Sequence, residues 1–340
     1  MTNITAHEDF DYQLWAQILK KSMNPESDVM HAVYAATLLI IFVVGVTGNL
    51  LTCTVIYLDR NMHTATNYYL FNLAISDFIV SFGILLEVNI IWYMPNFYYF
   101  QDYDLGNVVC KIHFFLVVAL WNNGILIMTT LAIERYIAIW HPLLLKSTPV
   151  WRRCMKTIIL IWTVAILETL PEVWTVNLIN ADKSPICFII PTPFAKVINA
   201  VLGLVTFIIP LGIMTFVYSM IAFKVNVSQT SDSRDRIFNH RNNRSKVNKL
   251  IVALTLSFLV CWLPFFTLRV LIVMSNTQLL EWLAERWELW LSISSINNWF
   301  SIILNPLLFS LMSTKFRRAL KTLWNTKIMR RTPVPHRVTL

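Results

Sequence analysis

Seven long apolar runs limit what this chain can fold into more than any other feature does. Each run is long enough to cross the roughly 30 Å hydrocarbon core of a bilayer as an α-helix, which needs about 20 apolar residues. A helix also satisfies its own backbone hydrogen bonds, as a segment inside lipid must. We therefore predict an all-α membrane protein built as a seven-transmembrane helix bundle. The runs lie near residues 31–58, 67–93, 108–140, 151–173, 194–224, 245–275 and 287–311.

The charged residues predict how the helices are oriented. Lys and Arg gather in the loops after the first, third and fifth runs and in the C-terminal tail, whereas the opposite loops hold more Asp and Glu. Because cytoplasmic loops collect basic residues, we expect a multi-pass plasma-membrane protein with its N-terminus outside and its C-terminus inside. The net charge of +9 then reflects this asymmetry and attraction to anionic membrane lipid, and does not indicate nucleic-acid binding.

Four parts follow from this topology. They are an extracellular tail at 1–30, the bundle at 31–311, a short amphipathic eighth helix at 312–326 and a cytoplasmic tail at 327–340. The eighth helix is predicted because Phe316, Leu320, Leu323 and Trp324 recur at helical spacing among basic residues, as in helices that lie on a membrane surface. A disordered basic tail is the alternative.

The ends outside the bundle carry two further expectations. No positively charged start precedes an apolar stretch and a small-residue cleavage site, so a removable signal peptide is not expected. Asn3 lies in an Asn-Ile-Thr triplet, which is a glycosylation acceptor on an outer segment.

Two of the five cysteines are expected to form a disulfide. Cys53 and Cys261 fall inside apolar runs and Cys154 lies on the reducing side, so each is expected to be a small buried or unpaired residue. Cys110, at the outer end of the third run, and Cys187, in the second outer loop, share the oxidising side. Elimination therefore favours this pair.

Polar and helix-distorting residues inside the runs give the most specific signal. Such groups are costly in a membrane and usually mark a site. One landmark falls on each run in chain order, which makes the set specific although each motif is short. The landmarks are Asn49, Asp77, the triplet Glu134-Arg135-Tyr136, Trp162, Pro210, the segment CWLP with Trp262 and Pro264, and the segment NPLLF with Asn305, Pro306 and Phe309.

Taken together, these landmarks resemble those of the rhodopsin-like (class A) G-protein-coupled receptors over nearly the whole chain. The resemblance implies a receptor that promotes nucleotide exchange on a heterotrimeric G protein, with arrestin and a receptor kinase as further partners. An enzyme is not expected, because the sequence holds no coherent nucleophile–base set. A transporter is a less favoured alternative.

The resemblance also implies a switch. Arg135 is expected to pair with Glu134 at rest and to be released toward the G protein when the sixth helix swings outward, and Tyr218 matches the tyrosine that faces the arginine after activation. Pro264 removes a backbone hydrogen bond and kinks the sixth helix beside Trp262. From the residues alone, a helix-end anchor is the favoured interpretation of Arg135, and a simple kink beside a packed Trp is the alternative for Pro264 and Trp262.

Two departures bear on this switch. Phe309 stands where the seventh-helix motif usually ends in Tyr, and Arg244 stands where some relatives have an acid that locks the arginine. Like charges cannot form that lock. We therefore hypothesise that the resting state depends on packing and on Glu134, so that Glu134→Ala raises ligand-free signalling.

Asp77 and Asn305 are expected to face each other across the bundle. An unpaired buried carboxylate is costly enough that protonation or a bound cation must be considered, and by resemblance the site is a pocket for an allosteric sodium ion. No other cofactor is expected, and the scattered His residues lack the spacing of a metal site.

The outer half of the bundle excludes some ligand classes. An amine receptor needs an acid on the third helix where this chain has Val117, and an opsin needs a Lys in the seventh run, which has none. Peptide remains the best class. Pairing among the charged residues, or their extension to the membrane interface, is an open alternative for each. The expected ligand-binding residues are Glu87, Val117, Val118, Trp121, Glu168, Glu172 and Arg269.

Closer resemblance is to the neuromedin U, pyrokinin and capa group of neuropeptide receptors. It is carried by HTATNYYLFNLAISD at 63–77, by CWLPFFTLRVL at 261–271 and by a Glu five residues before Trp92. It implies an amidated peptide ligand with a basic residue near its C-terminus, with Glu87 and Arg269 matching the group's second-helix Glu and sixth-helix Arg. The alternatives are an orphan or constitutively active receptor and a receptor for a non-peptide ligand.

Overall fold

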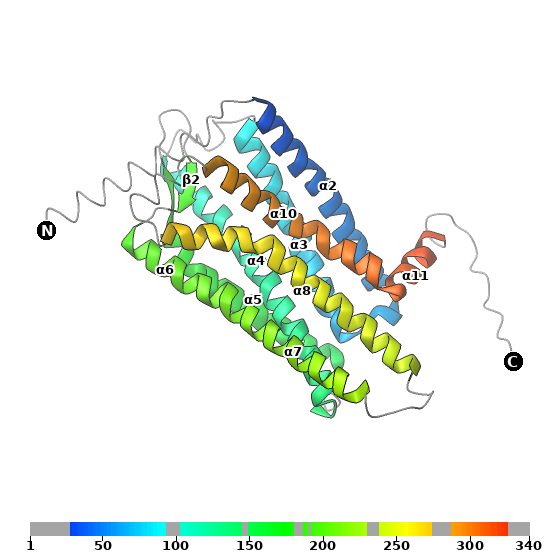
Figure 1. Cartoon of the computed structure of the whole chain (residues 1–340). Coiled ribbons are helices and arrows are strands. Elements are labelled where there is room, and N and C mark those ends of the chain that lie inside the picture. The colour runs from blue at the N-terminus through cyan, green and yellow to red at the C-terminus, as the bar shows by residue number, and fades with distance from the viewer. Residues whose placement is uncertain are drawn as a thin grey trace.

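Long helices packed side by side make up most of the molecule (Figure 1). The computed structural model describes residues 28–92, 103–144, 149–179, 186–189, 192–229, 238–273 and 287–325. Seven helical rods lie within these ranges, and the fifth is made of three segments. The rods are α2 (Asp28–Leu58), α3 (Ala65–Trp92), α4 (Tyr103–Trp140), α5 (Val150–Thr169), α6 (Pro193–Gly203) continued by η4 (Leu204–Ile208) and α7 (Ile209–Gln229), α8 (Phe238–Val273) and α10 (Trp287–Met312).

Smaller elements lie at the two ends of the bundle. The 3₁₀ segment η3 (Leu170–Trp174) continues α5 into the antiparallel strands β1 (Val176–Ile179) and β2 (Ile186–Ile189). At the other end lie the short 3₁₀ segment η1 (Arg60–Met62) and the helix α11 (Thr314–Leu323). We call these the hairpin end and the α11 end. The disulfide predicted between Cys110 and Cys187 is present and ties the hairpin to α4.

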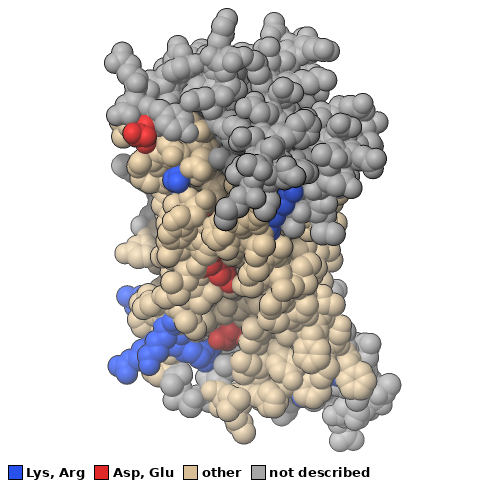
Figure 2. All heavy atoms as spheres, turned by 90° about the vertical axis from the view of Figure 1, so that its left-hand side faces the viewer, with Lys and Arg blue, Asp and Glu red and all other residues tan. Residues whose placement is uncertain are grey.

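The outward faces of the helices suit lipid rather than water. Five described helices are long and apolar enough to cross a membrane, and α8 adds a shorter apolar stretch, Thr255–Leu271. Large aliphatic side chains such as Ile40, Leu160 and Val197 are more than half exposed, which a soluble protein would avoid over so wide an area. In the face shown in Figure 2, most of the described surface is neither acidic nor basic.

The fifth rod changes its winding just ahead of Pro210. Proline has no N–H to donate and its ring crowds the carbonyl four residues earlier, which here belongs to Thr206. The chain makes the wider π-helical turns of η4 over Leu204–Ile208 before α7 continues. This is the distortion expected at Pro210, and π-turns of this kind often occur at functional sites.

The helix α11 buries one face against the bundle. The Ser313 side chain caps its start by accepting a hydrogen bond from the Phe316 N–H at 3.2 Å. Phe316 and Ala319 are buried, and the Phe316 ring lies 4.6 Å from the ring of Phe309 on α10. Phe309, which stands where the family motif usually has Tyr, therefore packs in the core and offers no hydroxyl.

Close contact between α2 and α10 depends on a missing side chain. A Cβ built on Gly48 would lie 2.9 Å from Cγ of Pro306, and a proline ring cannot rotate away. We expect Gly48→Ala to lower the free energy of unfolding by about 1–3 kcal/mol, the usual cost of overpacking. Gly212→Ala is the matched control, since nothing lies within 4 Å of its Cβ position. Thermal unfolding of the purified protein measures both variants, and equal midpoints for the two would contradict the prediction.

Candidate functional site

A buried ion pair joins three segments at the hairpin end. Nη2 of Arg269 on α8 lies 2.6 Å from Oε1 of Glu172 on η3, and Nε of Arg269 donates to Oδ1 of Asn199 on α6 at 2.7 Å. The two charged side chains are only 8% and 1% exposed. Oε2 of Glu172 is buried, and no described residue forms a hydrogen bond with it. The sequence predicts four charged ligand-binding residues and leaves open that some of them pair with one another. Glu172 and Arg269 do pair, so their charges neutralise each other.

Glu87 lies in a different environment, surrounded by neutral donors. Its Oε1 accepts hydrogen bonds from the hydroxyls of Tyr34 on α2 and, at 2.7 Å, Ser295 on α10. Its Oε2 accepts one from Nε1 of Trp299 at 2.5 Å. Within the described ranges no cation forms an ion pair with Glu87. Its carboxylate is thus held in place by three donors from α2 and α10, and no charge among the described residues compensates it.

An aromatic cluster connects Glu87 to the centre of the bundle. The Trp121 ring lies edge-on to Trp299 at 5.5 Å and to Trp262 at 5.1 Å. Trp299, Trp121 and Trp262 therefore form a continuous path from the Glu87 carboxylate to the kinked part of α8.

The other expected ligand residues lie in different surroundings. Val118 is buried in the core, and Val117 packs, half-buried, against the apolar cluster that contains Trp299. Glu168 is half-buried on α5 one turn before Glu172, and no ion pair of Glu168 is found among the described residues. Trp174, on η3, is 62% exposed, an exposure that is common for Trp at a membrane interface.

Four residues of these clusters were not singled out from the sequence: Tyr34, Asn199, Ser295 and Trp299. Tyr34 and Trp299 are separated from Glu87 by 53 and 212 positions, so no local pattern connects them. The one available signal was that each is a polar group inside an apolar run, where it must find a partner.

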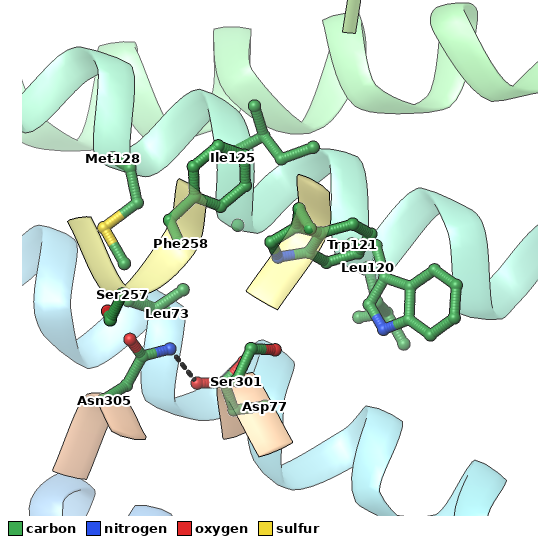
Figure 3. A pocket seen from close by; sticks show the side chains of 12 residues that line it. Leu73, Asp77, Leu120, Trp121, Ile125, Met128, Ser257, Phe258, Ser301 and Asn305 are labelled. Carbon is green, nitrogen blue, oxygen red and sulfur yellow. Dashed lines mark hydrogen bonds between the residues drawn. The ribbon is translucent and has the colours of Figure 1, made fainter. Parts of the chain in front are cut away.

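A small cavity of about 30 Å³ lies between α3, α4, α8 and α10. Figure 3 shows the side chains of Asp77 and Asn305 pointing toward each other on its wall, and Nδ2 of Asn305 donates to Oδ2 of Asp77 at 2.7 Å. Ser257 and Ser301 add hydroxyls to the lining, and Met128 supplies an apolar wall. A cavity needs about 10–15 Å³ to hold one water. The lining is otherwise mostly apolar, and its one carboxylate, one amide and two hydroxyls are oxygen donors of the kind that a small hard cation binds.

At the α11 end, the ion pair differs from the expected one. The structure pairs Glu134 with Arg153 of α5 rather than with Arg135, its neighbour in sequence. Nε and Nη2 of Arg153 each lie 3.2 Å from a different Glu134 oxygen. Successive helical residues do not face each other, so a partner on another helix competes well. No described residue forms an ion pair with Arg135.

The remaining switch residues are placed as follows. The hydroxyl of Tyr218 on α7 lies 2.9 Å from that of Thr255 on α8. Pro264 lies inside α8 and Pro306 inside α10. Tyr136 stacks on Trp140, with ring centres 6.0 Å apart. The Arg244 side chain, Asn3 and the tail at 327–340 lie outside the described residues, as does most of the tail at 1–30.

Residues 48–309 match the family described as 7 transmembrane receptor (rhodopsin family). The match covers most of the chain, so the chain belongs to this family and is a receptor rather than an enzyme, as the motifs predicted. The seven rods described above are the seven helices that define the class.

Within this class the chain is similar to receptors for neuropeptides. Neuromedin-U receptor 2 of Mus musculus is 31% identical over 297 residues, covering 83% of this chain and 72% of that receptor. Neuromedin-U receptor 1 of Mus musculus is 30% identical over 322 residues, 87% and 74% of the two chains. Pyrokinin-1 receptor of Drosophila melanogaster is 27% identical over 363 residues, 89% and 82% of the two chains. The predicted resemblance to neuromedin U and pyrokinin receptors is confirmed.

Proposed function

We propose that this receptor recognises an extracellular amidated peptide with a basic residue near its C-terminus. It lies in the plasma membrane with the hairpin end and N-terminus outside and the α11 end in the cytosol. The observation that carries the proposal is Glu87, a carboxylate held by three neutral donors and paired with no described cation. A ligand guanidinium or ammonium supplies the missing charge. The similarity to receptors named for neuromedin U and pyrokinin supports a peptide as its carrier.

The rest of the ligand contacts the other residues of the hairpin end. Val117, Val118 and Trp121 form the apolar floor beside Trp299. The Glu172–Arg269 pair is neutral as a whole, so it suits a neutral group that both donates and accepts, such as a peptide carboxamide. A free carboxylate at that place would be repelled by the unpartnered oxygen of Glu172.

The signal passes from the ligand to α8. A peptide seated on Trp121 displaces Trp262 beside the Pro264 kink, where the helix lacks one backbone hydrogen bond and bends at low cost. The α11 end of α8 then swings outward, and Arg135 reaches a heterotrimeric G protein and promotes GDP release. Tyr218 moves from Thr255 toward Arg135 in the active state. Arrestin and a receptor kinase bind the activated receptor at this end.

Sodium in the cavity beside Asp77 and Asn305 is proposed to stabilise the resting state. A ligand shifts an equilibrium only by its different affinity for the two states, so sodium that prefers the resting state weakens peptide binding. We expect sodium chloride, exchanged for an organic chloride at constant ionic strength, to lower peptide affinity about fivefold or more. Asp77→Asn should abolish the shift while Asp104→Asn, at the start of α4, retains it. An equal sodium effect in wild type and Asp77→Asn contradicts the proposal.

The function is tested by expressing the chain in cells that supply a promiscuous G protein. Calcium and cyclic AMP are recorded against a panel of amidated neuropeptides that includes neuromedin U. A concentration-dependent response to an amidated basic peptide, absent in cells without the receptor, supports the proposal. Silence to every peptide, together with a response to a lipid or an odorant, rejects it.

A further inference from the structure

We infer that Arg153 is a positioning residue that holds Glu134 away from Arg135 and thereby raises ligand-free nucleotide exchange. The inference rests on the proposed coupling to a G protein. It concerns the receptor without peptide, so it does not depend on which ligand the hairpin end binds.

The contacts of Glu134 favour Arg153 on geometric grounds. The guanidinium meets the carboxylate as a fork, with Nε to Oε1 and Nη2 to Oε2, both at 3.2 Å. Fork-to-fork pairs of Arg with a carboxylate are the more specific and stronger kind of ion pair. Tyr69 of α3 adds a third donor, its hydroxyl lying 3.3 Å from Oε1. Glu134 is thus held by helices on the side of the bundle occupied by α3 and α5.

The same contacts leave Arg135 without its expected partner. Arg153 engages both oxygens of Glu134, so neither oxygen is free to pair with Arg135. Arg135 lies within electrostatic range of both Glu134 and Tyr218 on α7, but it forms no ion pair with Glu134. Because no described residue forms an ion pair with Arg135, moving Arg135 toward a partner breaks no ion pair within the described part of the chain.

Removing Arg153 is therefore expected to lower ligand-free nucleotide exchange. In Arg153→Gln, the Glu134 carboxylate keeps only the long Tyr69 contact and becomes available to Arg135. The new pair opposes release of Arg135, so ligand-free exchange falls. The wild-type pair is partly exposed, with side-chain exposures of 19% for Arg153 and 16% for Glu134, so a fall of about two- to fivefold is expected.

The test uses the full chain in nanodiscs with purified heterotrimers and measures GDP release without peptide. Arg153→Gln should lower the rate, and Arg153→Lys, which keeps the charge but loses the fork, should restore part of it. Arg152→Gln is the matched control, because Arg152 is exposed and adjacent on the same helix, and it should leave the rate unchanged. In Glu134→Gln, the further change Arg153→Gln should have no effect, since the acid whose position matters is neutral.

Several results overturn the inference: an unchanged or raised rate in Arg153→Gln, an equal fall in Arg152→Gln, the same fall in the Glu134→Gln background, or a wild-type rate no higher than empty nanodiscs.

Failure of the proposed function is recognised separately. A wild-type receptor that releases GDP without peptide but responds to no peptide removes the proposed ligand and leaves the inference standing. No release with any heterotrimer, with or without peptide, removes both. The unfolding midpoints of the two single variants and the double variant report the ion pair itself, independently of G protein, and additive losses would also count against it.

Discussion

Arg269→Ala is expected to reduce the stability of the receptor more than any other substitution considered for the hairpin end. The change leaves the carboxylate of Glu172, whose side chain is 1% exposed, without a cation and with one oxygen already unpartnered. Breaking a buried ion pair in this way costs about 3–5 kcal/mol. We expect a large drop in the thermal unfolding midpoint, much less receptor at the cell surface, and loss of the peptide response.

The double variant Arg269→Ala/Glu172→Ala separates the pair from simple loss of packing. With both charges gone, no uncompensated charge remains, so this variant should unfold at a higher temperature than Arg269→Ala alone. Glu168→Gln is a control that neutralises an acid one turn away on α5. Its thermal unfolding midpoint should stay near that of wild type. A double variant less stable than both single variants would show that the two residues act independently.

The architecture could be predicted because the membrane imposes it on the sequence. A segment in lipid must be helical and apolar over about 20 residues, so seven runs gave seven helices. The Cys110–Cys187 bond was predictable because topology left only these two thiols on one side. The helix ends were less accurate. Helix α4 begins at Tyr103 and α8 at Phe238, whereas the runs begin near 108 and 245, because a helix can continue into polar sequence beyond the lipid.

The partners of the charged residues could be predicted only in part. Glu172 and Arg269 were recognised as a site, and their mutual pairing stayed one of two alternatives. Glu134 was expected to pair with its neighbour, yet its partner lies 19 positions away on another helix. Sequence gives the identity of a buried charge but not the rotation of the helices that face it. The β1–β2 hairpin was not predicted either, since strands of four residues are too short for a periodic signal.

Glu87→Gln is expected to weaken activation by a basic amidated peptide about 10- to 100-fold, the loss of a hydrogen-bonded charged contact of about 1.5–3 kcal/mol. The amide still accepts one hydrogen bond through its oxygen, but it no longer attracts a cation. Tyr34→Phe is the matched control: it removes a donor to Oε1 of Glu87 while keeping the charge, so its effect should be several-fold smaller.

The cause is isolated by changing the peptide as well as the receptor. Concentration–response curves are recorded for neuromedin U and for an analogue whose basic residue nearest the C-terminus is replaced by Gln. On wild type the analogue should lose potency by about the same factor as Glu87→Gln does, and on Glu87→Gln it should lose little more, because the two changes remove one shared contact. If the losses multiply instead, the ligand cation binds elsewhere. Glu87 would then serve to hold α2, α3 and α10 together at the hairpin end, through the same three hydrogen bonds that fix it in place.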